Sequence, residues 1–122
     1  MAKENKDKAT RKVLTEKENI KAVFTNFGTE SNWVQGTVEG DGRKFTFEAK
    51  LFDNGSEFGI KEGRVSKLAV SDPVVREQTK NYGESCVVEY DRGWGMRPKK
   101  EIKPYFNAIM ELLENSPKRF DK

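Results

Sequence analysis

The run that decides the fold is Lys44-Phe45-Thr46-Phe47-Glu48-Ala49-Lys50-Leu51-Phe52. Apolar and polar residues alternate along it, which is typical of a β-strand with one buried and one solvated face. A second strand-like run, 33–38, precedes it, and Glu39-Gly40-Asp41-Gly42 between the two has the composition of a turn. The two runs therefore predict an antiparallel hairpin.

Further strands are expected over 64–70 and 86–90. Between them, Asp72-Pro73 pairs an N-cap residue with a proline at the first helical position, which predicts a short helix through about Lys80. Residues 57–63 are compatible with a short strand or with an irregular connection.

Helical periodicity appears near both ends of the chain. A capping box at 15–18 is followed by apolar residues at helical spacing, which predicts a helix over 16–27: Ile20, Val23, Phe24 and Phe27. The most helix-like run is Tyr105 to Glu114, with Pro104 at its start or as a kink. We therefore expect a single α+β domain over 14–122, an antiparallel sheet with N-terminal and C-terminal helices packed on it, behind a flexible basic tail over 1–13.

Composition limits the class of partner. Charged residues make up 35% of the chain and hydrophobic residues 34%, so the core is lean and we expect a homo-oligomer, a dimer or higher. The formal charge is +3, and residues 1–12 alone carry +3, so the rest of the chain is neutral overall. A basic face on the folded part, typical of duplex nucleic-acid binders, is therefore not expected.

The sequence contains no histidine and one cysteine, Cys86. The commonest general base and metal ligand is thus missing, which disfavours hydrolytic chemistry and a metal site, and we expect neither an enzyme nor a cofactor. A hydrolase that uses only carboxylates is conceivable, but no carboxylate pair stands out. The chain has no apolar stretch long enough for a signal peptide or a membrane span, which predicts a cytoplasmic protein without a membrane partner.

The run Tyr90-Asp91-Arg92-Gly93-Trp94-Gly95-Met96-Arg97-Pro98 lies between the last strand and the last helix and is expected to be a strand-to-helix loop. An arginine fork and an indole ring on a glycine-flanked loop suit the phosphate and the base of a nucleotide. The structural alternative is that Trp94 fills the core and Arg92 pairs with a carboxylate.

Four runs carry a resemblance to a known family: Trp33-x-x-Gly36-x-Val38, Phe47-x-Ala49-Lys50, Gly63-Arg64-Val65-Ser66-Lys67-Leu68 and Tyr90-Asp91-Arg92-Gly93-Trp94. Over about 33–98 the chain resembles small phage and prophage proteins, and among them the first Thoeris anti-defence family. Gly95 stands where that family often has an acidic residue. The resemblance implies a sponge that binds the cyclic ADP-ribose isomer made by bacterial TIR-domain enzymes without cleaving it. Some members are also said to bind cyclic oligonucleotides at a second site, in a multimer.

Such a ligand needs a ring to stack on its adenine and cations to bind its pyrophosphate. The residue types that fit, and that we predict to bind it, are Arg92, Trp94, Arg64, Lys67, Tyr82, Lys103 and Asn107. Arg64 could instead pair with a carboxylate, and Lys103 and Asn107 could face solvent. The alternative function is a small mobile-element module that binds a protein or a nucleic acid and inhibits a host complex.

Overall fold

The computed structural model describes residues 19–120, and for Tyr82 it describes the backbone only. The strands are β1 (Lys21–Phe27), β2 (Trp33–Gly40), β3 (Arg43–Leu51), β4 (Val65–Ser71), β5 (Cys86–Asp91) and β6 (Trp94–Met96). The helices are the 3-10 turn η1 (Ile60–Glu62), α2 (Pro73–Thr79), α3 (Tyr82–Ser85) and α4 (Lys103–Glu114).

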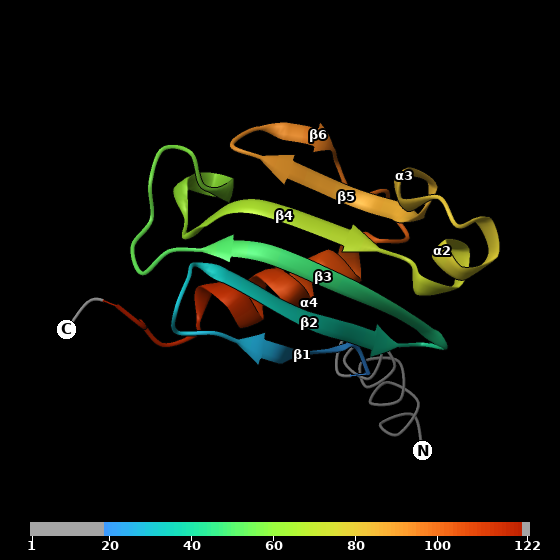
Figure 1. Cartoon of the computed structure of the whole chain (residues 1–122), viewed down its shortest axis with the longest axis horizontal. Helices are drawn as coiled ribbons and strands as arrows, with labels where there is room; N and C mark the ends of the chain where they lie inside the picture. Colours follow the sequence, from blue (N-terminus) through green and yellow to red (C-terminus); the bar gives the residue numbers. More distant parts are fainter. Residues whose placement is uncertain (1–18, 121–122) are drawn as a thin grey trace, which may run out of the picture.

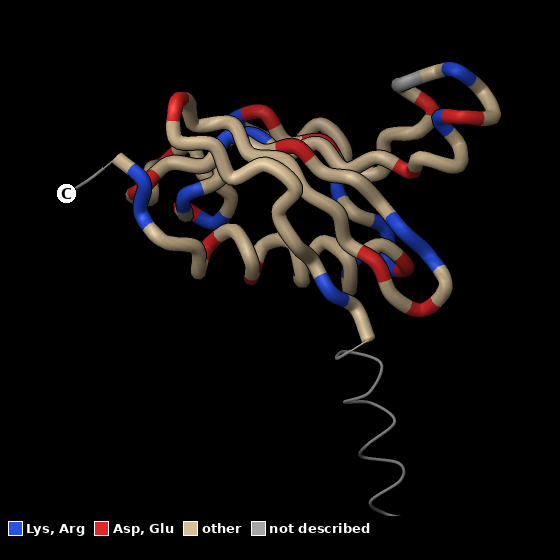
Figure 2. Tube along the Cα trace, turned by 60° about the horizontal axis from the view of Figure 1, so that its bottom comes forward, with Lys and Arg blue, Asp and Glu red and all other residues tan. Residues whose placement is uncertain are grey.

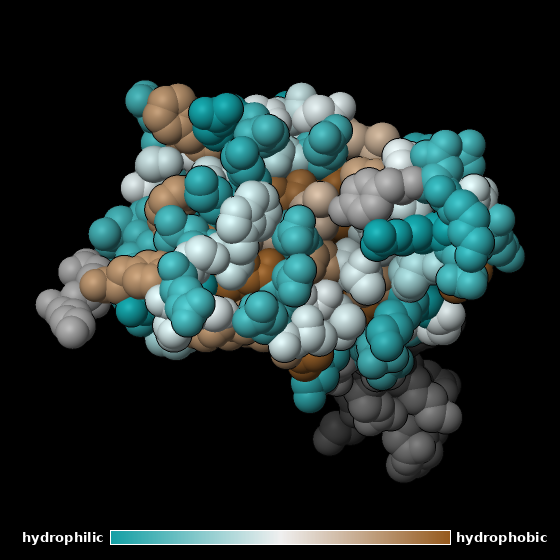
Figure 3. All heavy atoms as spheres, in the orientation of Figure 1, coloured by the Kyte–Doolittle hydropathy of each residue, from teal (hydrophilic) through white to brown (hydrophobic). Residues whose placement is uncertain are grey.

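The six strands form one antiparallel sheet in chain order, β1 to β6. Helix α4 lies across one face, behind the sheet in Figure 1. The other face is turned toward the viewer in Figure 3, where hydrophilic side chains are spread over most of it. None of the helices in residues 19–120 has the length and apolar character needed to cross a membrane.

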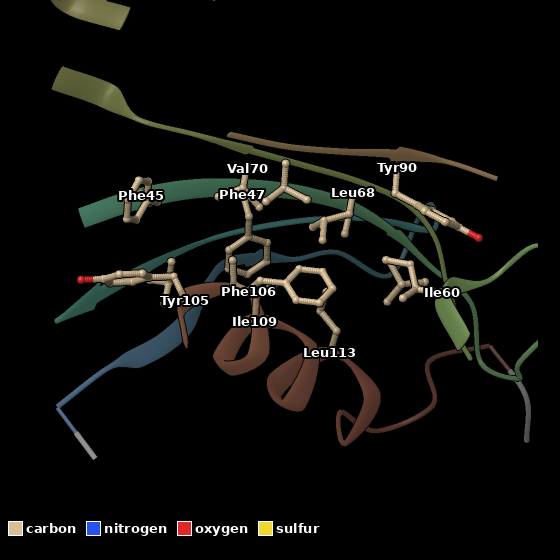
Figure 4. Packing of buried hydrophobic residues seen from close by; sticks show 14 of the residues in the cluster. Phe45, Phe47, Ile60, Leu68, Val70, Tyr90, Tyr105, Phe106, Ile109 and Leu113 are labelled. Carbon is tan, nitrogen blue, oxygen red and sulfur yellow. The ribbon is translucent and has the colours of Figure 1, made fainter. Parts of the chain in front are cut away.

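The core fills the space between the sheet and α4. Phe47 and Leu68 point from the strands toward the apolar side of α4, where Phe106, Ile109 and Leu113 meet them (Figure 4). At one end of this layer, the ring of Phe45 packs edge-on against Tyr105 with centroids 4.8 Å apart. The Tyr105 hydroxyl donates to the carbonyl of Gly40 at 2.7 Å, which fixes α4 to the β2–β3 hairpin.

The predicted hairpin, the central strands and the α+β class are confirmed. The alternating residues of β3 at positions 45, 47, 49 and 51 are all buried, as the period required. Helix α2 begins at Pro73, and the Asp72 carboxylate accepts from the backbone N–H of Val74 at 2.9 Å. Helix α4 has Pro104 in its first turn and ends before Asn115. Residues 57–63 form an irregular connection with η1.

The predicted helix over 16–27 is wrong in the part that the structure describes, because residues 21–27 form β1. A bulge at Thr25 explains the misleading pattern. Phe24 pairs with Gly36 and Asn26 with Gln35, so Thr25 is an extra residue and both Phe24 and Phe27 turn toward α4, with ring centroids 4.7 Å apart. A bulged strand thereby reproduces the i, i+3 spacing of a helix. The capping box at 15–18 and the tail over 1–13 lie outside the described residues.

The predicted strand-to-helix loop over 90–98 is also wrong. Strand β5 turns at Arg92-Gly93 into β6, where Glu89 pairs with Met96 and Tyr90 with Trp94. The connection to α4 follows only after β6. The turn is closed by the Asp91 N–H, which donates to the Gly93 carbonyl at 2.9 Å.

Candidate functional site

A groove of about 820 Å³ lies at the end of the sheet where β3 ends and β4 begins, the end at which the C-terminus is marked in Figure 1. We call it the lysine groove. Its cations are Lys50, Lys67 and Arg92, and its rings are Phe52, Phe58 and Phe120. The remaining lining residues are polar or acidic: Asn32, Asp53, Asn54, Ser56 and Ser66.

Two lysines lie face to face on β3 and β4, next to a bulge in β4. Lys50 pairs with Lys67 and Leu51 with Val65, so Ser66 is the extra residue. Side chains directly opposite across two strands have Cβ atoms about 5 Å apart, and like charges in that arrangement repel. The Lys67 ammonium also lies 3.6 Å from the Asp91 carboxylate. The Lys50 ammonium lies 5.6 Å from the centroid of the Phe52 ring.

Arg92 reaches the same groove from the β5–β6 turn. Its backbone N–H donates to the carbonyl of the bulge residue Ser66 at 2.8 Å. Its φ of 57° lies in the left-handed region, which costs a residue with a Cβ about 1 kcal/mol or more. The side chain is 63% exposed and its Nε lies 3.4 Å from Asp91, the carboxylate that also serves Lys67. Two of the three cations therefore share one carboxylate, so Lys50, Lys67, Arg92 and Asp91 together keep a net positive charge.

The aromatic rings give the groove flat apolar surfaces. Phe58 and Phe120 are 52% and 43% exposed as whole residues, high values for phenylalanine. The loop that carries Phe58 is held in place by the Tyr90 hydroxyl, which donates to the Phe58 carbonyl at 2.9 Å. Trp33, 40% exposed, is the cross-strand partner of Lys50 on β2 and continues the row of side chains beside the groove.

Arg64, predicted to bind the ligand, instead holds the end of α4. Its Nε donates to the Phe52 carbonyl at 2.8 Å and its Nη1 to the Ser116 carbonyl at 2.6 Å. Weaker bonds reach three more backbone carbonyls, those of Leu113 and Glu114 in the last turn of α4 and that of Pro117 after it. These carbonyls have no partner within a helix, so a guanidinium suits them.

Trp94 is part of the packing under the sheet and does not line the groove. Its ring lies 5.1 Å from that of Tyr90 and 5.8 Å from that of Phe106 on α4, with the Arg97 guanidinium 5.0 Å from its centroid. This agrees with the structural alternative for Trp94. Arg92 and Trp94 are two residues apart but serve opposite faces of the sheet.

The remaining predicted residues do not meet at the groove. Lys103 and Asn107 are exposed on α4, which covers the other face of the sheet. Tyr82 belongs to α3, and its side chain lies outside the described part of the structure. Of the seven predicted residues, the structure therefore brings only Lys67 and Arg92 together.

Several groove residues were not predicted. Lys50 lies on the polar side of the strongest predicted strand, but its position opposite Lys67 depends on the register between β3 and β4, which the sequence pattern did not predict. Phe58 and Phe120 come from a loop and from the C-terminal end. Arg119, beside Phe120, donates hydrogen bonds to backbone carbonyls at the same end of the sheet. Burial lowers the pKa of the Arg119 guanidinium, and the nearby charge of Arg64 lowers it further. The Asp53 carboxylate has the opposite effect and raises that pKa.

A second hollow, of about 860 Å³, lies at the opposite end of the sheet beside the β2–β3 turn. Its cations already face carboxylates: Lys21 and Lys44 both pair with Glu39 across strands, and Arg43 lies 3.4 Å from Asp72. Figure 2 shows the same mixing of basic and acidic residues along most of the trace. In the lysine groove Asp91 likewise pairs with Lys67 and Arg92, but Lys50 lies between Trp33 and Lys67 and faces no carboxylate across the strands, so this groove is the better candidate for an anion.

The lysine groove contains one acidic residue among those that line it. Its one lining carboxylate, Asp53, accepts the backbone N–H groups of Arg119 and Phe120 at 2.8 and 2.7 Å. Within residues 19–120 no group of three or more potential metal ligands comes together. Cys86 is half-buried, and burial raises the pKa of its thiol, which keeps it protonated at neutral pH.

Comparison with known proteins gives one family. No curated protein and no solved structure matches the chain. A family described as a domain of unknown function, DUF7678, matches residues 32–114, a span that includes β2 to α4 and all three groove cations. The chain therefore belongs to the DUF7678 family.

Proposed function

We propose that the protein binds an anionic nucleotide in the lysine groove and releases it unchanged. The observation that carries the proposal is the pair of Lys50 and Lys67, directly opposite each other with Arg92 in the same groove. Two ammonium groups in this position repel each other in the free protein. A phosphate between them replaces the repulsion with charge-assisted hydrogen bonds, so the arrangement favours an anion-bound state.

The rings select a nucleotide among anions. A pyrophosphate or sulfate alone would leave Phe58 and Phe120 in water, whereas an adenine can stack on either. Three cations, two exposed rings and several amide and hydroxyl groups match the phosphates, the base and the ribose hydroxyls of one ligand.

Within this class we propose the cyclic ADP-ribose isomer as ligand, which makes the protein a phage or prophage sponge that blocks Thoeris signalling in the bacterial cytoplasm. Two of the runs that carry the family resemblance contact each other at the groove. Gly63–Leu68 contributes Ser66 and Lys67, Tyr90–Trp94 contributes Arg92, and the Arg92 N–H to Ser66 carbonyl bond of 2.8 Å joins them.

We propose further that the ligand stays intact and that two copies enclose it. The sequence has no histidine to act as a general base, and the Asp53 carboxylate is engaged by backbone N–H groups.

The second copy is expected because rings that are about half exposed cover one side of a base only, and tight binding needs most of the ligand surface buried. Light scattering should therefore give at least twice the 14.0 kDa chain mass, and a monomer at all micromolar concentrations would contradict the second copy.

Calorimetric titration with the cyclic ADP-ribose isomer tests the site. Lys67→Gln and Arg92→Gln should each weaken binding tenfold or more, because each removes a charged hydrogen bond worth about 1.5–3 kcal/mol. Lys103→Gln is the matched control, since Lys103 is an exposed cation on α4 and should leave the affinity at the wild-type value. If Lys103→Gln alone weakens binding, the site lies on the outer face of α4 and the groove proposal fails.

A further inference from the structure

The chain after α4 returns to the lysine groove. We call residues 117–120 the C-terminal strap. It ends beside the loop that follows β3, and its last described residue, Phe120, lines the groove. The strap thus supplies a wall of the candidate site, from a part of the chain beyond the 32–114 span of the family match.

One side chain fixes the strap to the sheet. The guanidinium of Arg119 donates to four backbone carbonyls, at 2.6 to 3.2 Å: those of Gly28, Ser31, Asn32 and Leu51. It also lies 5.0 Å from the ring centroids of both Phe27 and Phe120. The planar fork of an arginine can make this set of bonds, and the single ammonium of a lysine cannot.

The strap also occupies the acidic residue of the groove. Both carboxylate oxygens of Asp53 accept backbone N–H groups of the strap, from Arg119 and Phe120. Bonds from N–H groups, together with the neighbouring guanidinium, offset the negative charge. Without the strap, the Asp53 carboxylate would be available to the lysines and would compete with an anionic ligand.

We infer that Arg119 is a positioning residue for the ligand site: it holds the strap so that Phe120 forms a stacking wall and Asp53 is kept from neutralising the groove cations. The inference rests on the proposed function, since it concerns the same groove. The strap thereby has two roles besides stabilising the fold: it places the Phe120 ring for stacking, and it engages the Asp53 carboxylate.

The electrostatic role is tested with Asp53 and Arg119 together. Arg119→Ala should weaken binding of the cyclic ADP-ribose isomer at least tenfold, measured by calorimetry on protein that circular dichroism shows to be folded. The double variant Asp53→Asn/Arg119→Ala should regain at least threefold of that loss, because the competing charge is gone. A purely structural Arg119 predicts no recovery in the double variant, and that result would overturn the electrostatic role.

The stacking role is tested with Phe120→Ala, which keeps Arg119. Phe120 is 43% exposed, so this variant should fold like the wild type and bind the isomer about fivefold to tenfold more weakly. Wild-type affinity in Phe120→Ala would overturn the assignment of Phe120 as a stacking wall, whether or not Arg119→Ala folds. These outcomes differ from failure of the proposed function, in which the wild-type protein itself does not bind the isomer.

Discussion

Replacing Lys50 with glutamine should separate stability from binding. The change removes the repulsion between Lys50 and Lys67, which is worth about 0.2–1 kcal/mol for like charges directly opposite in a sheet. It also removes the contact of the Lys50 ammonium with the Phe52 ring at 5.6 Å, worth roughly 0.5 kcal/mol at an exposed position. The two effects have opposite sign and similar size, so the free energy of unfolding should stay within about 0.5 kcal/mol of the wild type.

Nucleotide affinity should respond much more strongly. Lys50 would lose one charge-assisted hydrogen bond to a phosphate, which costs about 1.5–3 kcal/mol. At 1.4 kcal/mol per factor of ten, the Kd should rise by a factor of about 10 to 100. A residue that is needed only for the fold would show the opposite result, a large loss of stability and little change in nucleotide affinity.

Urea unfolding, monitored by tryptophan fluorescence, measures the free energy of unfolding. Calorimetric titration with the cyclic ADP-ribose isomer measures the Kd. Lys44→Gln is the control, because Lys44 lies on the same face of β3 but opposite Glu39. It should lose a little stability and no affinity. A Lys50→Gln protein that binds like the wild type, or that loses more than about 2 kcal/mol of stability, would refute the assignment of Lys50 to an anion site.

Three further predictions concern residues whose roles the structure separates. Arg64→Ala should lower the free energy of unfolding by about 3 kcal/mol, because two short charged bonds to Phe52 and Ser116 are lost, and Arg64→Lys should recover little of it in urea titrations. Trp94→Ala should cost about 3 kcal/mol of stability through lost packing on Tyr90 and Phe106, while the folded protein keeps its nucleotide affinity in calorimetry. Arg92→Gly should raise the thermal midpoint, because glycine relieves the left-handed backbone, and yet weaken nucleotide binding at least tenfold. A lower midpoint for Arg92→Gly, affinity lost with Trp94→Ala, or unchanged stability in Arg64→Ala would contradict the respective assignment.

The elements that could be predicted from sequence are those whose signal is local. Three predictions each depended on residues within one element: the alternating strand β3, and the helices α2 and α4, which have a proline in their first turn. All three are confirmed. The prediction of a helix where β1 lies was wrong because it, too, relied on local spacing alone. Its bulge at Thr25 becomes visible only through pairing with β2, and without that partner the spacing of Phe24 and Phe27 favours a helix.

The candidate site was predictable only in part because it depends on register. Lys67 and Arg92 were singled out by residue type. Lys67 meets Lys50 through the register of β3 with β4, and Arg92 is joined to the groove by the bond from its N–H to the Ser66 carbonyl. Both contacts link segments that are far apart in the sequence.

The placement of Arg64 shows the same limit. Arg64 has the chemistry of a phosphate ligand, but the carbonyls at the end of α4 occupy it, and nothing in residues 63–68 indicates where that helix ends. The C-terminal strap was not predicted because the four carbonyl partners of Arg119 come from two distant parts of the chain, the loop between β1 and β2 and the end of β3.

Recovery of the ligand after binding tests the central claim most directly. The protein is incubated with a substoichiometric amount of the cyclic ADP-ribose isomer and separated from free ligand by filtration. It is then denatured by heat, and the supernatant is analysed by mass spectrometry, with Lys67→Gln/Arg92→Gln protein treated in parallel. We predict that the wild type retains the isomer and returns it intact in stoichiometric yield, and that the double variant retains little. Retention by both proteins, retention by neither, or the appearance of ADP-ribose faster than in buffer would contradict reversible binding in the lysine groove.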